Sequence, residues 1–168
     1  KALLLGALVG AAPAEPLQIP AGAGQATLAA HWYPLPGAAP KPAVLALHGC
    51  GGLYQRDGTT LDARYPAYRQ LLAELGVQLL LTDSWGSRGL GPQCSIRPAD
   101  RKVSVADRRA DALTALDWLR RQAGVDPQRI ALLGWSHGGT TGLTVIDSRR
   151  SPQAPPLAAV ALYYPGCA

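Results

Sequence analysis

The chain alternates short, uniformly apolar runs with segments whose apolar residues recur at helical spacing. Residues 43–47 (AVLAL), 77–82 (VQLLLT) and 130–133 (IALL) are apolar almost throughout, which predicts strands buried on both faces of a sheet. Between these runs lie two helical patterns, each followed by a glycine that predicts a stop. Their apolar positions are 65, 68, 71, 72 and 75, and 112, 113, 116, 119 and 123.

Weaker patterns complete the order of elements. Residues 17–19 and 26–33 predict short edge strands, 137–146 a third helix, and 157–164 a last strand. The pair Asp126-Pro127 predicts a turn, and the polar, proline-rich stretch 148–156 predicts a loop. Alternating strands and helices indicate an α/β fold with a mostly parallel sheet covered by helices on both faces. With no repeat or linker, we interpret residues 15–168 as one domain whose C-terminal part is incomplete.

Composition narrows the classes of protein that fit. The 168 residues are 48% hydrophobic and 16% charged, which suits one globular domain with its own core. The net charge is +5, but the cations are scattered as arginine pairs, so we expect no binding to nucleic acid. No group of histidines, cysteines or carboxylates has the spacing of a metal site, and we expect no metal.

The first residues predict export. Residues 1–10 (KALLLGALVG) place one cation before a short apolar run, and small residues follow up to Ala14. This is typical of a secretory signal cut after Ala14, so residues 1–14 are interpreted as its remnant; the alternative is a buried N-terminal helix. The run is shorter than the ~20 apolar residues that span a bilayer, so no stable membrane insertion is expected. We predict a periplasmic or secreted protein.

An oxidising compartment permits disulfides. The chain has three cysteines, Cys50, Cys94 and Cys167, and all three follow predicted strand ends at one edge of the sheet. We predict a disulfide between two of them, with Cys94 as the best candidate for one partner. The third cysteine is left unpaired or pairs with a residue outside this chain.

Residues 134–138 (GWSHG) form a G-x-S-x-G pattern between an apolar run and a predicted helix. A sharp strand-to-helix turn would lift the Ser136 hydroxyl above the sheet, with glycines letting the backbone pass closely. The helix N-terminus adds N–H groups and a positive dipole end near a developing oxyanion. We predict Ser136 as a catalytic nucleophile. The alternative is a glycine-rich turn with a capping serine.

A glycine-rich loop, residues 48–52 (HGCGG), follows the first buried run. Such a loop lets a backbone N–H point into the site, so we predict that Cys50 and His137 donate main-chain hydrogen bonds to an oxyanion. Gly49 and Gly51 are predicted to contact the substrate. A phosphate loop is disfavoured, because its lysine and hydroxyl are missing. The alternative of Cys50 as nucleophile is disfavoured, because Ser136 occupies the turn.

A third loop, residues 83–89 (DSWGSRG), follows the next buried run, at the edge where ligands of open α/β sheets bind. We predict Asp83, Trp85 and Arg88 as substrate-binding residues. Asp83 is expected to pair with Arg88 or to fix the loop through backbone hydrogen bonds. It is disfavoured as the acid of a triad, because in hydrolases of this fold the acid follows the nucleophile along the chain.

Together these segments resemble the dienelactone hydrolase family of α/β-hydrolases. The resemblance is carried by GWSHGG after IALL, LHGCGGLY, TDSWGSRG, and DALTALDWL followed by VDPQRI, and it covers residues 43–168. It implies the α/β-hydrolase fold and hydrolysis without a cofactor. Prolyl-oligopeptidase-like peptidases carry similar loops. The founding enzymes of the family have cysteine at the turn where this chain has Ser136, which favours a general serine esterase over a dienelactone substrate.

A serine nucleophile needs a base and an orienting carboxylate. The family's acid and histidine follow later strands, so we expect both beyond residue 168. His31 is predicted to be a strand residue, His48 a hydrogen-bonded loop anchor, and His137 a backbone donor, so none of the three is predicted as the base. Residues 1–168 alone should show little turnover.

The sequence thus predicts a serine hydrolase that cleaves a small-molecule carboxylic ester or lactone through an acyl-enzyme on Ser136. Two alternatives remain open. One is a peptidase of the prolyl-oligopeptidase type, which needs a subsite for an amine. The other is a non-catalytic binding protein that keeps the fold without the triad.

Overall fold

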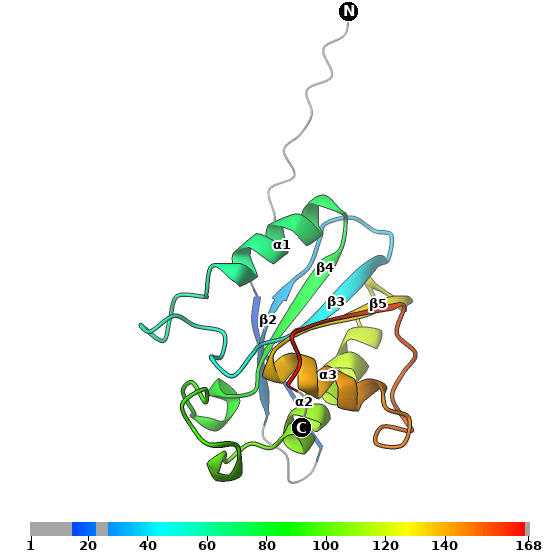
Figure 1. The fold of residues 1–168 in the computed structure, drawn as a ribbon. Coiled ribbons are helices and arrows are strands. Elements are labelled where there is room, and N and C mark those ends of the chain that lie inside the picture. Colours follow the sequence, from blue (N-terminus) through cyan, green and yellow to red (C-terminus); the bar gives the residue numbers. More distant parts are fainter. Residues whose placement is uncertain (1–14, 23–26, 167–168) are drawn as a thin grey trace, which may run out of the picture.

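The structure, a computed structural model, describes residues 15–22 and 27–166, which form a six-stranded sheet (Figure 1). The strands are β1 (Glu15–Ile19), β2 (Leu28–Tyr33), β3 (Lys41–Leu47), β4 (Gln78–Asp83), β5 (Val125–Trp135) and β6 (Ala159–Tyr163). Their order across the sheet is β1-β2-β4-β3-β5-β6. The predicted signal segment at residues 1–14 and Cys167 lie outside the described residues.

Parallel pairing brings the carboxyl ends of β3, β4 and β5 to one edge of the sheet. Leu47, the last residue of β3, lies opposite Thr82 of β4 and Gly134 of β5. The loops that follow these three strands therefore begin side by side, at the edge where open α/β sheets commonly bind ligands. Only β1 and β2 break the parallel pattern, because β1 pairs antiparallel with β2 and β2 pairs antiparallel with β4.

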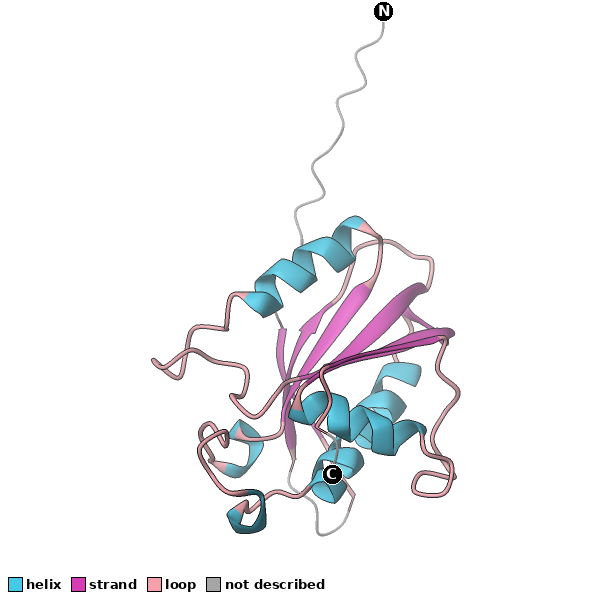
Figure 2. Cartoon of the chain, in the orientation of Figure 1, coloured by secondary structure: helices cyan, strands magenta, loops and turns pink. Residues whose placement is uncertain are grey.

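Helices cover both faces of the sheet, as predicted (Figure 2). Helix α1 (Arg64–Glu74) lies on one face, while α2 (Val105–Arg120) and α3 (His137–Ile146) lie on the other. Each face has its own apolar cluster, and the side chains of β3 alternate between them, Leu45 with Leu116 of α2 and Val44 with Tyr65 of α1. This two-sided burial explains why the central strands are apolar at almost every position.

The predicted helices form, with one difference in extent. α3 has the predicted bounds, and α1 ends at the predicted glycine, where Gly76 has a φ of 72° and the following Val77 N–H donates to Leu72 O (2.8 Å). α2 begins at Val105, seven residues before the apolar repeat that predicted it. Ser104 and Asp107 form a capping box there, which starts the helix on a polar turn.

Two strand predictions were wrong in detail. β2 is not an edge strand, because β1 pairs with its outer side. The predicted turn at Asp126-Pro127 lies inside β5, where the pairing with β3 is irregular. Between Lys41 and Ala43, β3 advances two residues while β5 advances five, from 125 to 130, so β5 bulges at the proline. No helix within the described ranges is both long and apolar enough to cross a membrane.

Candidate active site

Ser136 lies at an abrupt junction between β5 and α3. Its φ of 51° and ψ of −117° fall where non-glycine residues are rarely found. The Ser136 N–H donates to Tyr163 O (3.0 Å), which extends the ladder between β5 and β6, and α3 begins at the next residue. The chain therefore passes from strand to helix through one strained residue, the local geometry that a G-x-S-x-G pattern favours.

Glycines make this junction possible. A Cβ atom on Gly134 would lie 2.6 Å from the carbonyl oxygen of Gly138, and a Cβ on Gly138 would clash with the carbonyl oxygen of Leu47. On the other side of the junction, a Cβ on Gly49 would lie 3.5 Å from the Cβ of Ser136. The start of α3 and the loop after β3 are thus packed backbone against backbone, with Ser136 half-buried beside them.

The loop after β3 turns back on itself next to Ser136. Gly52 N–H donates to Gly49 O (3.2 Å), and the φ of 83° at Gly52 completes the turn. The hydroxyl of Tyr65, the buried residue of α1, donates to Gly52 O (3.0 Å). A helix on one face of the sheet therefore holds the loop that the sequence predicts as an oxyanion loop.

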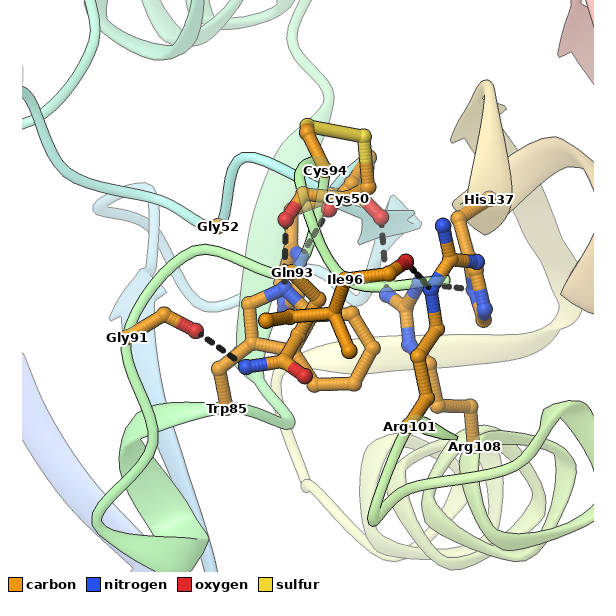
Figure 3. Close-up of a disulfide and its surroundings, with 12 residues drawn as sticks. Cys50, Gly52, Trp85, Gly91, Gln93, Cys94, Ile96, Arg101, Arg108 and His137 are labelled. Atoms are coloured by element: carbon orange, nitrogen blue, oxygen red, sulfur yellow. Dashed lines mark hydrogen bonds between the residues drawn. A yellow bond between two sulfur atoms is a disulfide. The ribbon is translucent and has the colours of Figure 1, made fainter. Parts of the chain in front are cut away.

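The backbone of Cys50 is fixed through its carbonyl group. Cys50 O accepts hydrogen bonds from Gln93 N–H (2.7 Å) and Trp85 Nε1–H (3.1 Å), as Figure 3 shows. Within the described part of the chain, the backbone N–H groups of Cys50 and His137 have no protein acceptor. Both N–H groups are thus available to a ligand, although their role toward an oxyanion stays a prediction.

A disulfide joins Cys50 to Cys94, which confirms the predicted pairing through Cys94 (Figure 3). Because the Cys50 sulfur is consumed in this bond, the alternative of Cys50 as nucleophile does not fit the structure. Both cysteines line a hollow of about 300 Å³ onto which Ser136 opens. Its other lining residues include the predicted Gly49 and Gly51 together with Gly52, Tyr54, Asp62, Arg64, Tyr65 and Tyr164.

His48 is the hydrogen-bonded anchor that the sequence predicted. Its ring is fully buried, Nδ1 donates to Gly49 O (2.7 Å), and Nε2 accepts from Ser84 N–H (3.2 Å). Burial, reinforced by the charge of Arg108, holds the pKa of His48 well below its usual value. A neutral ring with both nitrogens engaged fixes the loops after β3 and β4 and has no nitrogen left for Ser136.

The other two imidazoles are also engaged. His31 Nε2 is 2.8 Å from the hydroxyl of Tyr54, and His137 Nδ1 is 2.9 Å from Nη1 of Arg108. Burial and the Arg108 charge lower the pKa of His137 to about 4, so its ring is neutral at pH 7 and Nδ1 accepts the arginine hydrogen bond. Within the described residues, the Ser136 side chain makes no capping hydrogen bond and none of the three rings bonds to it.

Asp83 fixes its own loop, one of the two predicted roles. Its Oδ1 accepts from Gly86 N–H (2.9 Å), its backbone carbonyl accepts from the Ser87 hydroxyl, and burial raises the pKa of the carboxyl group. The other predicted role, pairing with Arg88, was wrong. Arg88 donates from both terminal nitrogens to Asp111 of α2 (2.9 and 2.8 Å), because the short helix η1 (Gly86–Arg88) turns its side chain toward α2.

The predicted substrate-binding residues therefore separate into groups. Gly49 and Gly51 line the hollow at Ser136, whereas Asp83 and Trp85 line a second hollow of about 180 Å³ that shares Gly51, Gly52 and Tyr54 with the first. Trp85 is almost wholly buried, with its ring centroid 5.1 Å from that of His48 and 5.5 Å from that of His137. Arg88 lines neither hollow, since its guanidinium is held by Asp111.

Arg108 of α2 is a neighbour of the site that the motifs do not indicate. Its guanidinium contacts His48 O (2.8 Å) and the ring of His137, and it lies 4.7 Å from the centroid of the Trp85 ring. A signal was present in the sequence, because Arg108 lies one helical turn before Ala112 on the buried stripe of α2. A charged residue on an apolar stripe is an informative exception.

Comparison with known proteins agrees with this geometry. Residues 105–168 match a family model described as the alpha/beta hydrolase fold. A protein of Bacillus subtilis (strain 168) named as a hydrolase, YtaP, is 34% identical over 110 residues, which are 60% of this chain and 37% of that protein. Acylamino-acid-releasing enzyme 2 of Oryza sativa subsp. japonica is 32% identical over 99 residues, 59% of this chain and 12% of that enzyme. The chain thus spans a minor part of each of these relatives.

Solved structures share the fold over nearly the whole chain. A structure described as a dienelactone hydrolase from Klebsiella pneumoniae subsp. pneumoniae MGH 78578 superimposes with a TM-score of 0.68 at 20% identity, covering 93% of this chain and 61% of that one. The dienelactone hydrolase-like promiscuous phosphotriesterase P91 from metagenomic libraries gives 0.67 at 24% identity, covering 94% and 61%.

The fold, together with the junction at Ser136, is that of an α/β-hydrolase. This fold is shared with solved structures described as dienelactone hydrolases, the family that the loop motifs resemble.

Proposed function

We propose that the protein is a serine hydrolase that cleaves a carboxylic ester or lactone of a small molecule through an acyl-enzyme on Ser136. The observation that carries this proposal is the strained Ser136 backbone (φ 51°) between β5 and α3, beside Gly49 and at the edge of a hollow of about 300 Å³. A hydroxyl held at such a bend stands clear of the sheet and next to main-chain N–H groups, as acyl transfer requires.

The reaction proceeds in two halves. Ser136 Oγ forms a bond to the acyl carbon while its proton passes to a base, and the carbonyl electrons move onto the oxygen. The resulting oxyanion accepts hydrogen bonds from the backbone N–H groups of Cys50 and His137. The C–O bond to the leaving group then breaks, and that oxygen takes the proton from the base. Water attacks the acyl-enzyme by the same route, releasing the acid and restoring Ser136.

We place the base histidine and its carboxylate outside residues 1–168. Two observations support this placement: the rings of His31, His48 and His137 are engaged with other partners, and the chain spans only 37% of YtaP. Residues 1–168 alone should then keep the hollow beside Ser136 and the backbone N–H groups of Cys50 and His137. Without the base they should show little turnover.

The hollow beside Ser136 suits a small molecule in size and lining. Ligand sites commonly occupy roughly 300–1,000 Å³, and this one is lined by tyrosine rings and by the charged residues Asp62 and Arg64. We also propose that the protein is periplasmic or secreted. The Cys50–Cys94 disulfide supports this location, since such bonds persist mainly in oxidising compartments.

The test uses the full-length protein with a fluorophosphonate probe and an activated ester such as p-nitrophenyl butyrate. The probe should label Ser136, as mapped by peptide mass spectrometry, and Ser136→Ala should abolish both labelling and ester cleavage. Ser148→Ala, an exposed serine in the loop after α3, is the matched control and should behave like the wild type. Labelling that survives in Ser136→Ala would refute the proposed nucleophile. An intact protein that ignores both reagents would favour the binding-protein alternative.

The similarity to acylamino-acid-releasing enzyme 2 supports a second candidate, a peptidase. An ester and an anilide with the same acyl group separate the two functions. An esterase should cleave the p-nitrophenyl ester far faster than the p-nitroanilide at equal concentration, whereas efficient cleavage of an N-acylated amino-acid anilide would favour the peptidase.

A further inference from the structure

Arg108 carries a positive charge into the interior directly beneath the candidate site. Its side chain is 1% exposed, and burial lowers its pKa to about 10, so the guanidinium remains charged at neutral pH. It lies on α2 with its charged end between the end of β3 and the start of α3 (Figure 3). Burying a charge costs stability unless strong partners compensate.

The groups in direct contact with this guanidinium are uncharged. Nη2 donates to His48 O (2.8 Å), Nη1 donates to Nδ1 of the neutral His137 ring (2.9 Å), and the face of Trp85 lies 4.7 Å away. The nearby carboxylate of Asp111 uses both oxygens for Arg88, and the buried Nε of Arg108 has no hydrogen-bond partner among the described residues. Burial of this charge is therefore not expected to stabilise the fold, so a contribution to stability does not explain why an arginine occupies this position.

The two hydrogen-bonded partners belong to the two segments that present the proposed oxyanion donors. His48 is two residues before Cys50, and His137 itself carries the other N–H. These segments are already in backbone contact, because a Cβ on Gly138 would clash with the carbonyl oxygens of Leu47 and His48. A planar guanidinium with donors in a fixed fork can set the separation and orientation of two such segments.

We infer that Arg108 is a positioning residue for the oxyanion hole, holding the Cys50 loop and the first turn of α3 in the arrangement that receives the negative charge. This inference rests on the proposed function. Arg108 touches no substrate; it acts on the two main-chain donors through His48 O and the His137 ring. Displacing such donors by a fraction of an ångström weakens binding of the oxyanion more than binding of the ester itself.

The experiment compares Arg108→Lys with Arg109→Lys in the full-length protein. Lysine keeps the charge but replaces the two-pronged fork by a single ammonium. Arg109 is the next residue of α2 and is half-exposed, so it controls for the same substitution on the same helix. For each variant we would measure kcat and KM with p-nitrophenyl butyrate, inhibition by a trifluoromethyl ketone that adds to the serine and mimics the oxyanion, and the thermal unfolding temperature.

Arg108→Lys should lower kcat about 10- to 100-fold and weaken trifluoromethyl ketone binding by a similar factor, with KM changed less than about twofold. Arg109→Lys should match the wild type. Should Arg108→Lys fail to fold, His137→Phe removes the ring acceptor while keeping the backbone N–H, and it should give the same pattern.

A folded Arg108→Lys variant with wild-type kcat and ketone affinity would overturn the inference and leave the proposed function standing. So would a loss of activity that merely follows the fraction of unfolded protein. Fluorophosphonate labelling of the wild type tests the proposed function independently of Arg108. A wild type that does not react at Ser136 would refute the proposed function itself.

Discussion

Gly138 in the first turn of α3 lies so close to Leu47 that any Cβ atom on it would clash with the Leu47 carbonyl oxygen. Gly138→Ala should therefore lower the free energy of unfolding by about 2–3 kcal/mol, as overpacking against backbone does. It should also reduce labelling of Ser136 by displacing α3. Gly124→Ala, where a Cβ meets open space, should stay within about 0.5 kcal/mol of the wild type in urea unfolding. Equal stability of the two variants would contradict this packing.

The disulfide predicts sensitivity to reduction. Cys50 and Cys94 are 44 residues apart in sequence, so their bond restricts a long loop of the unfolded chain. The Cys50→Ser/Cys94→Ser double variant should lose about 2–4 kcal/mol of unfolding free energy and part of its esterase activity. Dithiothreitol should produce the same losses in the wild type and none in the double variant. A reductant effect that persists in the double variant would place the sensitive bond elsewhere.

The fold was predictable from the sequence because its strongest signals are local. Residues 43–47 and 77–82 are apolar at almost every position, as in strands covered on both faces, and GWSHG marks the junction to α3. The early start of α2 was missed, since its first turns are polar on the outside and depend on the capping box at Ser104. Likewise, whether β2 lies at an edge depends on whether β1 pairs with it, which no local pattern encodes.

The sequence predicted those parts of the site that depend on backbone conformation, but not the partners of its side chains. Ser136 and the glycine turn after β3 follow from backbone geometry, so their motifs locate them. Side-chain partners across the fold do not follow from spacing. Pairing with the nearer Asp83 was one of two predicted arrangements, but Arg88 pairs with Asp111 of α2 instead, and Arg108 contacts the carbonyl oxygen of His48. Such contacts depend on how α2 is placed against the loops.

The Arg88–Asp111 ion pair should matter far more than the other ion pair on α2. Asp111 is 6% exposed at its side chain, and its loss would leave the Arg88 guanidinium without its hydrogen-bonded carboxylate and remove a favourable negative charge near Arg108. Asp111→Asn should destabilise the protein by about 3–5 kcal/mol in chemical denaturation. Asp117→Asn breaks the exposed pair with Arg121, where both side chains are more than half exposed, and should cost less than about 1 kcal/mol. Similar losses in both variants would argue against a buried network at Arg88.

Acid should destabilise the protein from about pH 6.5 downward. The pKa of His137 falls from 6.5 in the unfolded chain to about 4 in the fold, and burial holds that of His48 lower than 6.5 as well. As the pH falls, the unfolded state binds these protons at a higher pH than the folded state does. The contribution of the two neutral rings to the free energy of unfolding is therefore complete above pH 6.5 and is lost as the pH falls toward 4. Each imidazole contributes at most about 1.4 kcal/mol per pH unit to this slope, and the half-exposed His137 contributes less than the buried His48.

Asp83 acts in the opposite direction. Burial raises its pKa, so proton uptake by its carboxyl favours the folded state and offsets part of the histidine effect at the acid end of the range. Urea unfolding at pH 7.0, 6.0 and 5.0 should give free energies that decrease steadily, and His137→Gln should reduce the slope by removing one of the titrating rings. A free energy of unfolding that is constant or rises between pH 7 and 5 would mean that these rings are not held neutral, and the hydrogen bond from Arg108 to His137 Nδ1 would lose its basis.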